Sequence, residues 1–140
     1  MRQVITQTLP AGSGMLLGLI GTAMLTKTEA FLAMSDVRID PDPSLLSELK
    51  APSLLLILTG VLMLIGSVRS RCADLGLAVG AVVYGSYGMA RLAGMVIDGL
   101  PTGSLLVATL IELVLAALLM ALRISRLSAK QPAAQQPSAA

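Results

Sequence analysis

The chain has 140 residues, of which 55 % are hydrophobic and 13 % are charged, whereas a typical soluble domain has about 25 % charged residues. This composition predicts one domain of the membrane class. With a net charge of +2, no run of Lys or Arg, and only Phe31, Tyr84 and Tyr87 as aromatic residues, nucleic-acid binding is excluded. Histidine is absent and Cys72 is the only cysteine, which excludes His/Cys metal sites, axial His haem ligation and His-activated nucleophiles. We therefore expect no metal, no other cofactor and no independent enzymatic activity.

The first predicted membrane span covers residues 9–26 (LPAGSGMLLGLIGTAMLT), which carry no charge and are just long enough to cross a bilayer. Gly14 and Gly18 form a small-xxx-small pair, and Gly21 continues the same flank, so we expect close contact with another helix. A cleaved signal peptide is the alternative, with a poor cleavage site at residues 28–30. The single basic residue before the span and the glycines within it favour a retained helix.

Residues 27–51 form the one sizeable polar segment, which we predict to be an acidic extracytoplasmic loop. Phe31, Leu32 and Met34 near its beginning indicate a short interfacial helix. The Asp-Pro-Asp-Pro sequence at 40–43 stops that helix, because a residue before proline is pushed out of the α region. The acidic residues do not have the register of an EF-hand calcium loop, so a solvated loop is expected.

Three further spans follow along the chain. Residues 52–68 form the clearest span, with Pro52 in the first turn, where its missing N–H costs nothing. The third span, residues 73–97, contains five glycines, which predicts a central helix contacted on several sides. Residues 103–124 form a leucine-rich fourth span with a single acidic residue inside. Residues 125–140 end in a low-complexity Pro/Ala/Gln segment and are predicted to be a disordered cytoplasmic tail.

The distribution of basic residues predicts the orientation of these spans. The N-terminus, the second loop and the C-terminal flank carry six basic residues, whereas the other side carries three basic residues and six acidic ones. The prediction is therefore an all-α, up-down-up-down four-helix transmembrane bundle with the N and C termini in the cytoplasm. Residues 1–124 form its single integral membrane domain.

Two ionisable residues, Arg91 and Glu112, lie inside the third and fourth predicted spans. Such a residue is costly in a membrane, so it usually faces the protein interior and has a partner. Arg91 lies six residues before the helix end near Ile97, and Glu112 lies nine residues after the next helix begins near Gly103. These spacings place them roughly 9 and 14 Å below the same surface. The sequence therefore predicts a buried Arg91–Glu112 ion pair.

Other polar residues are predicted to gather around this pair and to form a pocket open to the outside. Asp98 lies seven residues after Arg91 on the same helix face, two charges precede the second span at the same surface, and two tyrosines lie one to two turns deeper. A guanidinium offers bidentate donors to a carboxylate, a phosphate or a carbonyl-bearing ligand. The alternatives are a purely structural pair that fixes how the two helices dock, and a glutamate that carries a proton. The predicted cluster consists of Arg91, Glu112, Asp98, Glu48, Lys50, Tyr84 and Tyr87.

Two sequence motifs resemble those of a bacterial family known as domain of unknown function 4345, which is grouped with the DoxX-like superfamily. ELKAPS at 48–53 is similar to its E-x-R-A motif, and ARLAGMVIDGLP at 90–101, followed by Glu112, is similar to its R-L-x-G-x-x-x-D-G-x-P…E pattern. Lys50 stands where the family has arginine, and a Pro-Ser pair replaces the usual Tyr-Gly. The resemblance implies a small, multi-pass protein of the bacterial inner (cytoplasmic) membrane and implies no activity, although some DoxX-like relatives act as redox-linked membrane subunits.

The expected function is binding of a membrane lipid, a small amphipathic ligand or a partner subunit through the polar cluster in the outer leaflet. The alternative is a proton-coupled transporter, or an accessory subunit of a membrane redox complex, that uses Glu112. The glycine-rich faces of the first and third helices also suit a homo-oligomer.

Overall fold

The computed structural model describes residues 2–130, with side chains described for residues 7–129, and this part of the chain is all-α. All of the helices except the short α2 are long and apolar enough to cross a membrane, which fits the predicted membrane class. The helices are α1 (Arg2–Thr26), α2 (Thr28–Ala33), α3 (Pro43–Val68), α4 (Ser70–Ile97) and α5 (Gly103–Lys130).

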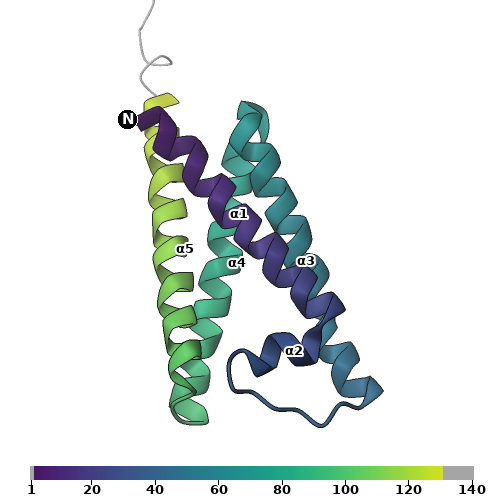
Figure 1. Cartoon of the computed structure of the whole chain (residues 1–140). Coiled ribbons are helices and arrows are strands. Elements are labelled where there is room, and N and C mark those ends of the chain that lie inside the picture. The colour runs from purple at the N-terminus through teal and green to yellow at the C-terminus, as the bar shows by residue number, and fades with distance from the viewer. Residues whose placement is uncertain (1, 131–140) are drawn as a thin grey trace, which may run out of the picture.

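The long helices form two packed pairs, α1 with α3 and α4 with α5, and the two pairs are joined mainly where α3 packs against α4. The two pairs lie close together at the end where α3 turns into α4, and they diverge toward the end where α2 lies (Figure 1). The N-terminal end of α1 and the C-terminal end of α5 lie at the end opposite to α2 (Figure 1).

Glycines bring the backbones of α1 and α3 into direct contact, as the small-residue flank of the first span predicts. A Cβ atom on Gly14 would lie 2.8 Å from the carbonyl oxygen of Gly60, and one on Gly60 would lie 2.5 Å from that of Gly14. A Cβ atom on Gly21 would lie 2.7 Å from the carbonyl oxygen of Ser53. In a membrane, where lipid tails are as apolar as leucine, such close packing drives helix association.

The α4 helix is contacted on two sides, which confirms the central position predicted from its glycines. On one side, a Cβ atom on Gly80 would lie 2.6 Å from Sδ of Met63 in α3. On the other side, a Cβ atom on Gly88 would lie 2.7 Å from a methyl group of Leu113 in α5. The small residues of α4 therefore accept larger side chains from both neighbours.

The α3 helix begins at Pro43 rather than at residue 52, so the predicted loop over 27–51 contains α2 and the first turns of α3. Asp42 is the N-cap, and its carboxylate accepts hydrogen bonds from the N–H groups of Ser44 at 2.8 Å and Leu45 at 3.2 Å. Pro43 occupies the first turn and Pro52 lies inside the helix. The assignment of Pro52 to the first turn is wrong, because the Asp-Pro sequence that stops a preceding helix also starts a following one.

The other long helices also extend beyond their predicted ends. The α1 helix begins at Arg2, and α4 begins at Ser70, so that Arg69 alone links it to α3. The α5 helix continues through residues 125–130, where disorder was predicted. This correction follows from the composition, because these six residues contain neither proline nor glycine and continue the apolar periodicity. Residues 131–140 lie outside the described part of the chain.

Candidate functional site

Arg91 of α4 and Glu112 of α5 form an ion pair, as predicted. Nε of Arg91 donates to both carboxylate oxygens of Glu112, at 3.1 Å for Oε2 and 3.3 Å for Oε1. The Glu112 side chain is 16 % exposed and the Arg91 side chain is 35 % exposed. The glutamate is therefore mostly enclosed, whereas the arginine is only partly buried, so the predicted burial holds better for Glu112 than for Arg91.

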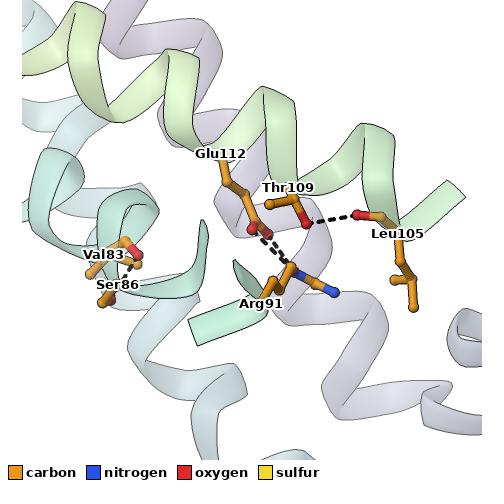
Figure 2. A network of polar contacts seen from close by, with 6 residues as sticks. All are labelled: Val83, Ser86, Arg91, Leu105, Thr109 and Glu112. Carbon is orange, nitrogen blue, oxygen red and sulfur yellow. Dashed lines mark hydrogen bonds and ion pairs between the residues drawn. The ribbon is translucent and has the colours of Figure 1, made fainter. Parts of the chain in front are cut away.

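The outer end of the Arg91 guanidinium is not used by this ion pair. Both hydrogen bonds come from Nε, and neither terminal nitrogen has a hydrogen bond or ion pair to the rest of the described side chains and backbone. The end of the guanidinium points away from the carboxylate of Glu112 (Figure 2). Because an arginine side chain has no acceptor and its terminal nitrogens are strong donors, these groups remain available to a bound molecule.

A cavity of about 350 Å³ lies between the two helix pairs and is lined by residues from all five helices and from the loop after α2. Its polar residues are concentrated on α4 and α5, and Arg91 and Glu112 are its only charged residues. Leucine, isoleucine, valine, alanine, methionine and phenylalanine make up most of the remaining wall. This combination of a mostly apolar wall and a few polar groups is typical of small-molecule sites, and the volume lies near the lower end of their usual range of about 300–1,000 Å³.

Both tyrosines of the chain line this cavity. Tyr84 is 3 % exposed, and its hydroxyl donates a hydrogen bond of 2.8 Å to the carbonyl oxygen of Ser13 in α1. The Tyr87 side chain is also part of the wall, and within the described residues its hydroxyl makes no hydrogen bond. Tyr84 therefore ties α4 to α1, whereas the Tyr87 hydroxyl has no partner among the described residues.

The segment that contains α2 closes one side of the cavity. Phe31 and Leu32 of α2, and Ser35 and Val37 of the loop that follows, belong to the cavity wall. Oγ1 of Thr102, in the turn between α4 and α5, donates a hydrogen bond of 3.0 Å to the carbonyl oxygen of Ser35. This contact joins the α2 segment to the opposite helix pair and was not predicted, since the two residues are far apart in sequence and belong to no local pattern.

The remaining predicted site residues do not line the larger cavity. Asp98 is the C-cap of α4 and lines a second hollow of about 200 Å³ together with Arg91. Glu48 and Lys50 lie near the beginning of α3 and line neither of the two cavities. The α3 and α5 helices do not contact each other in the part of the chain that the structure describes, so the predicted convergence fails for Glu48 and Lys50.

Thr109 is a site residue that the sequence prediction did not include. It is 3 % exposed, lines the smaller hollow, and uses Oγ1 to donate to the carbonyl oxygen of Leu105 at 2.8 Å. Thr109 lies beside the ion pair in Figure 2. Its position three residues before Glu112 places it on the same helix face, and this spacing is the signal that would have revealed it.

Comparison with known proteins gives a single result. The family described as a domain of unknown function (DUF4345) matches residues 5–123 of the chain. No curated protein and no solved structure matches. Because the match covers most of the sequence and includes all the residues of the larger cavity, the chain belongs to the DUF4345 family.

Proposed function

We propose that this protein spans a membrane and binds a small amphipathic ligand in the cavity between its two helix pairs. Four apolar helices of sufficient length support the membrane location. Large apolar side chains are exposed on their outer surfaces, among them Leu19 at 62 %, Leu58 at 66 %, Val82 at 64 % and Leu110 at 64 %. Exposed apolar surface of this extent is typical of contact with lipid rather than with water.

The proposed topology has four alternating crossings, with both termini on the cytoplasmic side of a bacterial inner membrane. Arg69 and Arg71 lie where α3 meets α4, and Arg123 and Arg126 lie near the end of α5. These two regions lie at the same end of the molecule, opposite to the acidic segment that contains α2 (Figure 1). The bias of basic residues toward the cytoplasm then directs the α2 end, and the cavity beside it, toward the outer leaflet.

The observation that carries the proposal is that Arg91, whose terminal nitrogens have no partner among the described residues, lines a mostly apolar cavity. An unpaired hydrogen-bond donor in low-dielectric surroundings is unfavourable, and a ligand acceptor would satisfy it. The apolar wall offers space for a hydrocarbon chain on the same ligand. A molecule with a polar head and an apolar tail therefore fits both parts of the site, and binding rather than catalysis is the proposed activity.

A proton-coupled role for Glu112 is the second candidate. The observation that favours it is that the Glu112 carboxylate lines the cavity and lies inside a candidate membrane span. An intramembrane carboxylate that reaches a cavity can carry a proton along a transport path. This candidate predicts that Glu112→Gln abolishes proton flux in liposomes that carry a pH gradient.

The binding proposal is tested with the intrinsic fluorescence of the protein. The chain contains no tryptophan, and its two tyrosines, Tyr84 and Tyr87, both line the cavity. A monoacylglycerol with a brominated acyl chain is added to the protein in phosphatidylcholine liposomes, and quenching of the tyrosine emission is recorded. We expect saturable quenching, because each protein molecule has a fixed number of sites in which the bromine atoms lie beside both rings.

Two substitutions on α5 provide the matched comparison. Ala108 lines the cavity, so Ala108→Phe is expected to fill it and to abolish saturable quenching. Ala117 is exposed on the outer surface of the same helix, so Ala117→Phe is expected to leave the quenching unchanged. Quenching that never saturates, or that is equal in both variants, would contradict binding in the cavity. Proton flux that depends on Glu112, found together with that result, would favour the second candidate.

A further inference from the structure

We infer that the ligand head is an uncharged hydrogen-bond acceptor, a carbonyl-bearing group on a single hydrocarbon chain, and not an anion. This inference rests on the proposed function and specifies the class of ligand. A free arginine end usually indicates an anion, because guanidinium groups bind carboxylates and phosphates in a bidentate manner. The charges around this particular arginine lead to the opposite conclusion.

The cavity already contains a balanced pair of charges. The Arg91 guanidinium and the Glu112 carboxylate are 3.1 Å apart, and every residue that α1, the α2 segment and α3 contribute to the wall is uncharged. The formal charge of the cavity is therefore zero. An anionic head would add an uncompensated negative charge to apolar surroundings, which is strongly unfavourable. A carbonyl oxygen accepts from the terminal nitrogens of Arg91 without this penalty.

A second carboxylate strengthens the argument. Asp98 lines the smaller hollow, and Arg91 is the only basic residue in the wall of either cavity. An anionic head that approaches Arg91 from either side would therefore meet one cation and one or two carboxylates. In the larger cavity, an anionic head together with Glu112 would place two negative charges beside the single positive charge of Arg91.

The size and the polar groups of the cavity define the rest of the ligand. A volume of about 350 Å³ is near the lower end of the range for small-molecule sites, which favours one hydrocarbon chain over two. Tyr87 lines the same cavity as Arg91, and its hydroxyl, which has no partner among the described residues, can donate or accept a hydrogen bond. A head that combines a carbonyl with a hydroxyl, as in a monoacylglycerol, satisfies both groups.

The test compares two ligands with the same acyl chain, one with an uncharged head and one with an anionic phosphate ester. A monoacylglycerol and its phosphate ester, with the same acyl chain, compete with the brominated monoacylglycerol for the protein in phosphatidylcholine liposomes. Affinities are expressed per membrane-bound ligand, so that different partitioning into the bilayer does not enter the result. We expect the neutral ligand to bind at least about tenfold more tightly, since an unpaired buried charge typically costs that much or more.

Charge-changing variants of the protein should alter this preference in a defined direction. Glu112→Gln keeps an oxygen that can accept from Nε of Arg91 and leaves the cavity with a net positive charge. We expect the ratio of affinities to shift by at least about tenfold toward the phosphate ester. Asp98→Asn, at an exposed position in the turn after α4, should shift the ratio in the same direction by a few-fold and provides the test if Glu112→Gln does not fold.

Four outcomes of these experiments separate the possibilities. Equal or tighter binding of the phosphate ester to the unmodified protein would overturn the inference, and so would folded charge variants whose ratio does not change. Saturable competition by the neutral ligand, together with the expected shift, supports it. If the brominated monoacylglycerol gives no saturable quenching at all, the proposed binding function fails, which is distinguishable from a site that binds with the opposite charge preference.

Discussion

The Arg91 side chain is held at Nε by Glu112, and removal of either partner leaves the other charge without compensation in a partly buried place. We expect Arg91→Ala and Glu112→Ala each to lower the stability of the protein in detergent. The double variant should lose less stability than the sum of the losses in the two single variants, with a coupling free energy of about 0.5–3 kcal/mol. The stability of the unmodified protein, the two single variants and the double variant is measured by thermal unfolding followed by circular dichroism. Strictly additive losses would mean that the two charges are satisfied independently.

The two tyrosines form a matched pair of test positions. Tyr84→Phe removes the hydrogen bond to the carbonyl oxygen of Ser13 and should lower the free energy of unfolding by about 0.5–1.5 kcal/mol. Tyr87→Phe removes a hydroxyl that has no hydrogen bond among the described residues, so it should change the stability little in the absence of ligand. The free energies of unfolding of the two variants are measured in the same detergent and compared. Equal losses would contradict the separate roles of the two hydroxyls.

At the scale of the elements, the beginning of α3 depends on one exposed carboxylate. The pKa of Asp42 is lowered because its ionised form accepts hydrogen bonds from the N–H groups of Ser44 and Leu45. A lowered pKa in the folded state means that this contribution is present above the ordinary pKa of an aspartate and is lost as the pH falls through the lowered value. We therefore expect the first turn of α3 to loosen in acid.

Hydrogen exchange of the Ser44 and Leu45 amides measures this effect. Asp42→Ala should speed the exchange of both amides above the pKa of Asp42, because the cap is lost, and should remove most of the acid response. Asp42→Asn should retain the cap but lose its dependence on pH, since asparagine also serves as an N-cap and does not ionise. Asp40→Ala, two residues earlier and outside the cap, is the control. An unchanged acid response in Asp42→Asn would show that another group is responsible.

The contact between α1 and α3 tolerates no side chain at its closest point. Gly60→Ala would place a Cβ atom 2.5 Å from a backbone oxygen of α1, where only a shift of the whole helix can relieve the overlap. We expect a loss of about 1–3 kcal/mol in the free energy of unfolding. Gly18→Ala, whose Cβ atom would meet nothing within 4 Å, should be neutral or slightly stabilising. A similar loss in both variants, measured by thermal unfolding in detergent, would contradict the role of close packing.

Some features of this structure are encoded locally and others are not. The Arg91–Glu112 pair was predictable, because two charges inside apolar spans at similar depth have few other partners. The glycine flank of the first span also predicted its close contact with another helix. The start of α3 was misassigned because two prolines, Pro43 and Pro52, both suit a first turn, and only the Asp42 cap decides between them.

The cavity itself depends on how the helix pairs are placed. Its wall contains residues from α1 to α5, and its shape results from the divergence of the two pairs toward α2. Depth along a helix, which sequence spacing does provide, is not sufficient to predict such a site. Glu48 and Lys50 have a depth consistent with the cluster, yet they lie on a helix that does not contact α5 within the described residues.

At the scale of the whole molecule, the helix pairs pack closely at one end of the bundle and diverge around the cavity at the other. Glycines let α1 pack closely on α3 and let α4 contact both α3 and α5, and the two pairs lie closest together near the α3–α4 link (Figure 1). Toward α2, the only hydrogen bond between the α2 segment and the opposite pair in the described side chains is that from Thr102 to Ser35. The two pairs are therefore held together least at the α2 end, and we expect the proposed ligand to enter the cavity there.

The proposed orientation in the membrane determines which leaflet would supply the proposed ligand. In a Cys72→Ser background, Asp40→Cys places a thiol in the exposed segment before α3, and Arg71→Cys places one in the first turn of α4. We expect a membrane-impermeant maleimide to label Asp40→Cys in intact spheroplasts and to label Arg71→Cys only after the membrane is permeabilised. The reason is that basic residues near span ends remain in the cytoplasm. The reverse pattern would place the cavity in the inner leaflet, whereas labelling of both positions in intact spheroplasts would contradict a single orientation.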